Sequence, residues 1–121
     1  MRADIIAHAL AKAPEEACGL VVTRPGQDPT ILCCINVHPT PVTRYKIDDA
    51  EIYRVLVQYG EEHLLAIYHS HPITQPYPSP TDRADAHYPD AFYILASLRD
   101  ATPELRAFRI KKDWVYEVDL A

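Results

Sequence analysis

The chain lacks the features of a membrane-embedded or exported protein. None of its apolar runs approaches the ~20 residues that a membrane-spanning helix requires, which argues against a spanning protein. Its first residues, Met-Arg-Ala-Asp-Ile-Ile, include no separate apolar segment followed by a small-residue cleavage site, so secretion is not expected. The expected compartment is therefore the cytoplasm.

An excess of positive charge is also missing. Lysine and arginine together number 12, against 17 aspartate and glutamate residues, and the net charge is −5. Proteins that bind nucleic acids chiefly through the phosphate groups need a surplus of basic residues. We therefore expect no nucleic-acid partner, and the acidic balance does not by itself identify any other partner.

Cysteine is scarce, and its three occurrences do not form the framework of a disulfide-stabilised protein. The number is odd, and there is no Cys-x-x-Cys pair. Cys33 and Cys34 are adjacent, so on a strand their side chains would point to opposite faces. We expect Cys18, Cys33 and Cys34 to be buried, unpaired thiols in a reducing compartment, with a reactive or regulatory thiol as the alternative.

The 121 residues form an ordinary globular mixture, 48% hydrophobic and 24% charged, without repeats, low-complexity segments or a linker. A chain of this length buries roughly two-thirds of the surface that its unfolded form exposes, which is enough for one hydrophobic core. We therefore expect a single domain over residues 1–121.

Apolar periodicity and turn residues predict a mixed architecture. Helices are predicted over residues 2–12, 48–59 and 80–88, and strands over residues 17–23, 31–37, 63–69, 91–98, 105–111 and 114–118. Pro14 follows the first helix, Asp48 or Asp49 can cap the second, and Gly60 suits its end. The first two strands and the last two, joined through Lys112-Asp113, are expected to form hairpins. The fold class is α/β or α+β, with a sheet of about six strands packed by about three helices.

The most informative segment is His69-Ser70-His71-Pro72, which follows an apolar strand. Residues two apart on a strand share a face, so both imidazoles can point at one metal ion. Two neutral imidazoles and a carboxylate are a common protein set for catalytic zinc, with water in the fourth position. Asp82, on the first turn of the helix after the proline-rich loop, is the natural third ligand.

Each part of this segment also has a purely structural interpretation. A lone His-x-His at a strand end is commonly unrelated to metal. Ser79, Pro80 and Asp82 fit the N-cap, N1 and N3 positions of a helix capping box, although such a cap and a metal ligand are compatible. The other histidines share no spacing and are interpreted as surface or core residues: His8, His38, His63 and His87.

A hydrolytic zinc site also needs a base that takes a proton from water. Glu15 and Glu16 stand between the first helix and the first strand, just before Ala17-Cys18-Gly19. Small residues at this strand start would let another backbone approach closely. From the local pattern alone, a solvated pair of glutamates is the default interpretation.

Taken together, these pieces resemble the JAMM (MPN+) metalloprotease motif: an early glutamate, then His-x-His, seven residues, serine, two residues and aspartate. The later part matches at every position, with His69 and His71, the seven residues 72–78, Ser79 and Asp82. The early glutamate falls on Glu16, and the order of elements matches over nearly the whole chain. The short length and Tyr77-Pro78-Ser79-Pro80-Thr81-Asp82 are most similar to the prokaryotic Mec+ branch.

The resemblance implies a mixed, curved sheet between helices, similar to that of cytidine deaminases. It implies a peptidase in which His69, His71 and Asp82 hold Zn²⁺, Glu16 is the general base, and Ser79 donates a hydrogen bond to the oxyanion. The implied substrate is an amide bond at the C-terminus of a small ubiquitin-like sulfur-carrier protein. We expect residues 40–47 to border the groove for its extended tail.

Three alternatives stay open at this point. The chain could cleave other peptides, as is expected of JAMM domains in phage tails, or it could be a non-catalytic interaction module. A zinc nucleobase deaminase is suggested only by the shared fold, because those enzymes use a Cys-x-x-Cys pair that is missing here. The released residue, the oligomeric state and the native metal beyond zinc are left open, since the same ligands accept other divalent ions.

Overall fold

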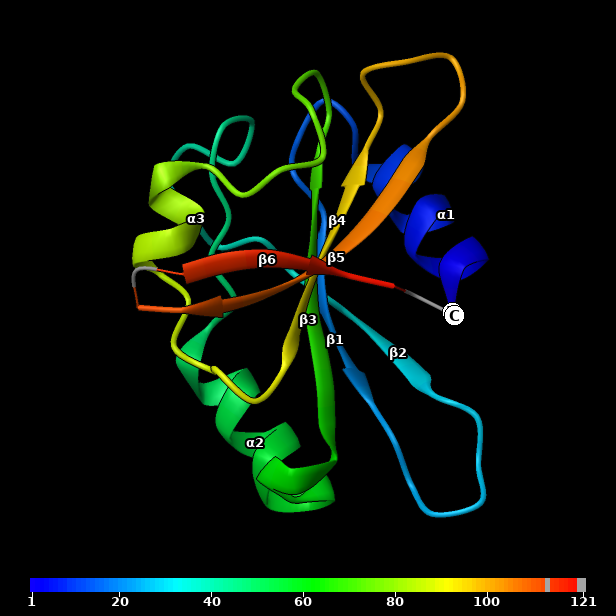
Figure 1. Cartoon of the computed structure of the whole chain (residues 1–121), viewed down its shortest axis with the longest axis vertical. Helices are drawn as coiled ribbons and strands as arrows, with labels where there is room; N and C mark the ends of the chain where they lie inside the picture. Colours follow the sequence, from blue (N-terminus) through cyan, green and yellow to red (C-terminus); the bar gives the residue numbers. More distant parts are fainter. Residues whose placement is uncertain (113, 120–121) are drawn as a thin grey trace.

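The computed structural model describes residues 1–112 and 114–119, and within them the chain forms a mixed six-stranded sheet (Figure 1). The strand order is β2-β1-β3-β4-β5-β6, in which β3 and β4 are parallel and the other neighbours are antiparallel. The strands are β1 (Cys18–Val22), β2 (Thr30–Cys34), β3 (Leu64–His71), β4 (Phe92–Ser97), β5 (Glu104–Lys111) and β6 (Trp114–Val118). The predicted sheet and both hairpins are confirmed; Asp113, in the predicted turn of the second hairpin, lies outside the described residues.

Helices cover both faces of this sheet (Figure 1). They are α1 (Arg2–Lys12), α2 (Asp49–Tyr59) and α3 (Pro80–Ala84), with a short 3₁₀ helix, η1 (Glu61–His63), between α2 and β3. Ile5 and Ala9 of α1 pack into the apolar cluster on one face, whereas α2 packs with half-buried side chains against the cluster on the other. α3 lies on the same face as α2. Among the helices described, none combines the length and apolar character needed to cross a membrane.

The predicted signals at the ends of α2 are confirmed. The Asp48 carboxylate accepts a hydrogen bond from the Ala50 N–H at 3.3 Å and so caps the helix N-terminus. Gly60 ends the helix with a φ of 91°, a conformation that side chains other than glycine rarely adopt. These caps begin and end the helix that packs against the sheet on the α3 side.

Two predicted elements end several residues earlier in the structure. β2 ends at Cys34, not residue 37, because the backbone of Glu16 that would pair next is bonded instead to the Pro41 carbonyl and the Asn36 side chain. α3 ends at Ala84, not residue 88. Pro89 disfavours a helical conformation at Tyr88, whose N–H donates to the Tyr93 hydroxyl at 3.0 Å.

β3 lies at the centre of the sheet and carries the His-x-His segment. The strand ends at His71, two residues beyond its predicted end, so both histidines belong to it. As predicted, it is buried along nearly its whole length, because β1 and β4 flank it and helices cover it. The close neighbour of Gly19 is the ring of Tyr68, where a side chain at position 19 would overlap.

The cysteines are unpaired, as predicted, but not all buried. Cys18 and Cys34 are buried, and burial raises the pKa of Cys18 to about 12, which keeps its thiol protonated and unreactive. Cys33 is exposed, so its predicted burial was wrong: it lies on the opposite face of the outermost strand from Cys34.

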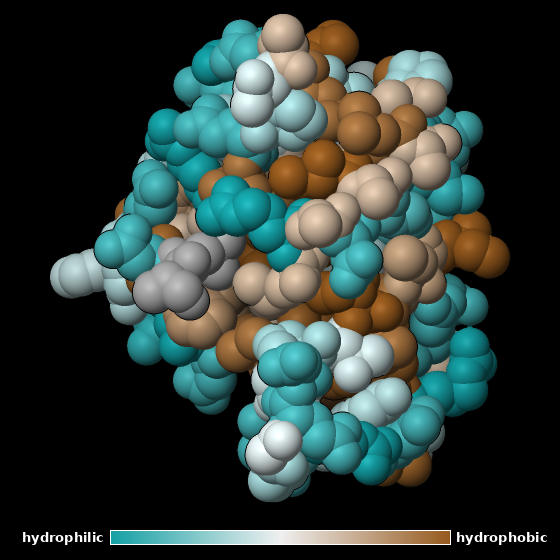
Figure 2. All heavy atoms as spheres, turned by 90° about the vertical axis from the view of Figure 1, so that its right-hand side faces the viewer, coloured by the Kyte–Doolittle hydropathy of each residue, from teal (hydrophilic) through white to brown (hydrophobic). Residues whose placement is uncertain are grey.

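On the side of the molecule that carries α1, hydrophobic side chains are exposed between hydrophilic ones (Figure 2). Such exposure is ordinary for a folded chain and identifies no partner.

Candidate metal centre

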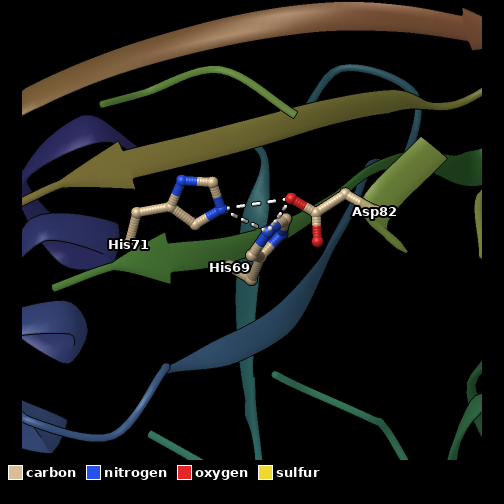
Figure 3. A group of neighbouring side chains, drawn as sticks. All are labelled: His69, His71 and Asp82. Carbon is tan, nitrogen blue, oxygen red and sulfur yellow. Dashed lines mark hydrogen bonds and ion pairs between the residues drawn. The ribbon is translucent and has the colours of Figure 1, made fainter. Parts of the chain in front are cut away.

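The ends of two elements, β3 and α3, bring together the three predicted metal ligands. His69 and His71 lie two residues apart at the carboxyl end of β3, and Asp82 lies in the first turn of α3. Their side chains point toward one another (Figure 3), and they are the one group of three potential ligands found among the residues described. Both histidines are buried, with 2% and 5% of their surface exposed.

The ligand atoms form a nearly equilateral triangle. The two Nε2 atoms of His69 and His71 lie 3.2 Å apart, and they lie 3.2 Å and 3.1 Å from Oδ2 of Asp82. In a tetrahedral zinc site with bonds of about 2.0–2.1 Å, ligand atoms lie about 3.3 Å from one another. The triangle therefore fits one face of a zinc tetrahedron and leaves the fourth position open to water or substrate.

Hydrogen bonding and burial orient the three ligands and shift their pKa values. Nδ1 of His71 lies 2.8 Å from the Gln75 carbonyl, which can only accept, so Nδ1 carries a proton and Nε2 faces the site. Although burial opposes it, hydrogen bonding to Asp82 and Gln75 raises the pKa of His71. Burial lowers the pKa of His69, which favours its neutral form. Although burial opposes it, hydrogen bonding to His69 and His71 holds the pKa of Asp82 well below its usual range.

The capping box predicted at Ser79 is present and fixes the carboxylate ligand. Ser79 Oγ accepts from the Asp82 N–H at 3.1 Å, and Asp82 Oδ2 accepts from the Ser79 N–H at 2.9 Å. The same Oδ2 atom faces both histidines, so the hydrogen bond that caps the helix also holds the carboxylate in position as a ligand. Ser79 Oγ acts as an acceptor here and keeps its own hydroxyl proton to donate elsewhere.

The loop between β3 and α3 is tied to its surroundings. Pro76 and Pro78 are buried, and Ser97 Oγ at the end of β4 donates to the Thr74 carbonyl at 2.6 Å. The loop lacks ladder hydrogen bonds of its own, as its prolines predict, but these contacts hold it over the end of the sheet. This explains how a proline-rich segment can present Asp82 to two histidines from a different element.

Glu16 lies beside this group and is 7% exposed, whereas Glu15 is exposed to solvent. The solvated-pair interpretation was therefore wrong for Glu16. Burial, opposed by His71 and reinforced by Asp82, raises the pKa of Glu16 from 4.5 to about 7. Its Oε1 atom is buried without a hydrogen-bond partner among the described residues. A buried carboxyl with a free oxygen and a pKa near neutrality has the properties of a general base.

Sequence reasoning missed three residues around the centre. The Tyr45 ring stacks on His69, with centroids 4.2 Å apart and planes 20° apart. Ser70 Oγ accepts from the Ala17 N–H at 2.7 Å, next to Glu16. The Asn36 amide donates to the backbone carbonyls of Glu16 and Arg44. Ser70 was marked by its place between the two histidines. Asn36 falls in the predicted strand of residues 31–37 and Tyr45 in the segment of residues 40–47 that was expected to border the groove, but neither was singled out.

Comparison with known proteins decides the family. Residues 1–111 match the family described as prokaryotic homologs of the JAB domain. The chain belongs to this family. Among JAB relatives, the CysO-cysteine peptidase of Mycobacterium tuberculosis is 39% identical over 119 residues, which cover 91% of this chain and 81% of that protein. The probable TtuB-protein conjugate cleaving protease of Thermus thermophilus is 36% identical, over 84% of this chain and 66% of that protein.

A solved structure has the same fold as this JAB chain. The solution structure of a Desulfitobacterium hafniense protein superposes with a TM-score of 0.80 at 30% sequence identity, over 98% of this chain and 85% of that one. The predicted α+β fold and membership of the JAMM-type family are thereby confirmed.

Proposed function

We propose that this JAB-family chain is a zinc-dependent peptidase that hydrolyses an amide bond at the C-terminus of a small ubiquitin-like sulfur-carrier protein. The observation that carries the proposal is the convergence of three ligand atoms beside Glu16, whose buried Oε1 has no hydrogen-bond partner in the described part of the chain. The names of the two relatives, which refer to CysO-cysteine and to TtuB conjugates, support this class of substrate.

His69, His71 and Asp82 would hold the metal, and the two imidazole nitrogens with one carboxylate oxygen suit zinc. When bound, zinc supplies Lewis-acid chemistry, because it makes a water molecule more acidic and polarises the scissile carbonyl. The reducing cytoplasm is the proposed compartment, and the three unpaired cysteines are compatible with it.

Glu16 transfers the proton in this mechanism. Its free Oε1 accepts a proton as water adds to the carbonyl carbon, and it returns that proton to the amine as the carbon–nitrogen bond breaks. A pKa of about 7 suits both steps, since the same group must accept and then donate near neutral pH. The products are a free carboxylate on the carrier tail and a free amine.

Ser79 is proposed to stabilise the oxyanion. Its hydroxyl oxygen is fixed by the Asp82 N–H, one turn from the ligand carboxylate, and its proton is available for the substrate oxygen. A donor of this kind contributes about 3 kcal/mol to transition-state stabilisation. Its effect adds to the polarisation of the same oxygen by the metal.

The loop of residues 40–47 is proposed to border the binding groove for the tail, and a cavity next to the site supports this. The cavity has a volume of about 320 Å³, and Tyr45, Lys46 and Ile47 form one of its walls. The cavity is also lined by Tyr88 and other residues of the segment that follows α3. Since Tyr45 also stacks on His69, this wall continues to the metal centre.

The decisive experiment is incubation of the zinc-loaded protein with carrier–amino acid adducts, followed by intact-mass measurement of the carrier. We expect the adduct to lose the mass of one residue, and Glu16→Gln to leave it unchanged while still binding zinc. Glu15→Gln is the matched control, because that neighbouring carboxylate is exposed, and it should cleave normally. A wild-type protein that binds zinc but leaves every adduct intact would refute the proposal, and cleavage of unrelated peptides alone would favour the broader peptidase alternative.

A further inference from the structure

One side chain, that of Asn36, connects the loop after β2 with Glu16. Its amide group Nδ2 donates to the Glu16 carbonyl at 3.0 Å and to the Arg44 carbonyl at 2.9 Å, with a longer contact of 3.4 Å to Pro41. Its Oδ1 accepts from the N–H groups of His38 and Lys46, both at 3.1 Å. An amide has two donor hydrogens and two acceptor lone pairs, so this side chain is fully used.

The orientation of this amide follows from its partners. Turning it by 180° would place NH₂ against two backbone N–H groups and the oxygen against two carbonyls, which would break all the short bonds. The loop itself closes where the Val37 N–H donates to the Lys46 carbonyl at 2.9 Å. Residues 37–46 belong to no described strand, so they depend on Asn36 for several of their backbone hydrogen bonds.

Glu16 depends on the same contacts. It precedes β1, so the sheet ladder does not hold it. Its carbonyl accepts from Asn36, and its N–H donates to the Pro41 carbonyl at 2.7 Å, so both of its backbone polar groups are bonded to this side chain or its loop. At the far end of the loop, Tyr45 stacks on the ligand His69. The loop therefore touches the base on one side and a ligand on the other.

We propose that Asn36 is a positioning residue that fixes Glu16 and the loop of residues 37–46 as one unit against the metal ligands. The effect of this proposal on turnover rests on the proposed function, because the position of Glu16 affects the rate only if Glu16 acts as the base. Asn36 touches neither the ligands nor the reacting atoms, and it acts through Glu16 and the loop. A displacement of the base by about 1 Å is enough to lower the rate on the order of 10²-fold.

The kinetic test compares Asn36→Ala and Asn36→Asp with wild type in zinc-loaded protein. We expect kcat to fall on the order of 10²-fold in both variants and zinc affinity to stay within about twofold of wild type. Asn36→Asp keeps the shape and the two acceptor bonds but faces the carbonyls of Glu16 and Arg44 with an oxygen that cannot donate. If it restored wild-type kcat, or if either variant raised KM at unchanged kcat, positioning of Glu16 would be overturned.

A second readout does not need activity. Amide hydrogen exchange of the zinc-loaded protein reports the Glu16 N–H, which is bonded to Pro41, and the adjacent Ala17 N–H, which is bonded to Ser70. In Asn36→Ala we expect the protection of the Glu16 amide to fall by about tenfold or more while the Ala17 amide keeps its protection. Equal protection of Glu16 in variant and wild type would overturn the proposal.

The controls separate the two proposals. Thr23→Val removes a different side-chain bond, to the His63 carbonyl, and should change neither kcat nor the exchange of Glu16. If Asn36→Ala does not fold, Asn36→Ser takes its place, because its hydroxyl can retain one bond. A wild-type protein that binds zinc but cleaves no adduct would refute the peptidase function, and the exchange measurement would still decide whether Asn36 fixes Glu16.

Discussion

Replacing Glu16 by glutamine should make the metal-free protein more stable, and only at higher pH. Glu16 is 7% exposed, and burial raises its pKa from the ordinary 4.5 to about 7. The folded state therefore disfavours the ionised carboxylate that the proposed mechanism requires. Glutamine has the same shape without the charge, so Glu16→Gln removes this cost and keeps the packing.

The magnitude follows from the two pKa values. Below pH 4.5 the carboxyl is protonated in both states and folding carries no penalty. As the pH rises from 4.5 to about 7, the unfolded chain ionises while the folded chain holds its proton, so stability falls. Linkage gives a penalty of roughly 0.8 kcal/mol at about pH 5 and roughly 3 kcal/mol at about pH 8.

The assay is urea denaturation of both proteins in the presence of a chelator, at about pH 5 and about pH 8. Glu16→Gln should exceed wild type by up to roughly 3 kcal/mol at the higher pH and by less than about 1 kcal/mol at the lower. Glu15→Gln, at the exposed neighbouring position, should show no such pH-dependent gain. An equal gain at both pH values, or no gain at about pH 8, would refute the claim that burial of the base destabilises the fold.

Four further predictions concern the centre. Glu16→Ala should keep zinc and lose turnover, whereas His71→Ala or Asp82→Ala should lose both, as metal analysis of the purified variants will check. Ser79→Ala should bind zinc and lower kcat on the order of 10²-fold, measured at saturating substrate. The value of kcat/KM should rise about tenfold per pH unit below a pKa of about 7 and then level off, because Glu16 must be ionised to accept a proton. A chelator should abolish cleavage, and added zinc should restore it.

Local patterns predicted the parts of the structure that depend on neighbours in sequence. The caps of α2 at Asp48 and Gly60, and the capping box of Ser79 with Asp82, each lie within a few residues of the backbone groups that they satisfy. The shared face of His69 and His71 follows from the two-residue repeat of a strand. Such features could be predicted because the interacting groups are separated by a short, fixed number of residues along the chain.

Local sequence patterns could not predict contacts between segments that are distant in the sequence. Asn36 and Tyr45 act on Glu16 and His69, which lie 20 and 24 residues away, and nothing periodic connects them. Glu16 was singled out by the resemblance to a family motif, since its local surroundings predicted a solvated pair. Its backbone N–H donates to Pro41 in the loop of residues 37–46, and the Asn36 amide bonds that loop to the Glu16 carbonyl.

Sheet register brings Glu16 close to His71, although more than fifty residues separate them in the sequence. β1 and β3 are antiparallel with Cys18 opposite His69, and continuing that register by two residues places Glu16 level with His71. Gly19 lies opposite Tyr68, whose ring occupies the space where a side chain would stand. A slip of one residue would set this ring against a side chain and turn the base to the wrong face of the sheet. The packing that selects the register therefore also places Glu16 beside the proposed metal ligands.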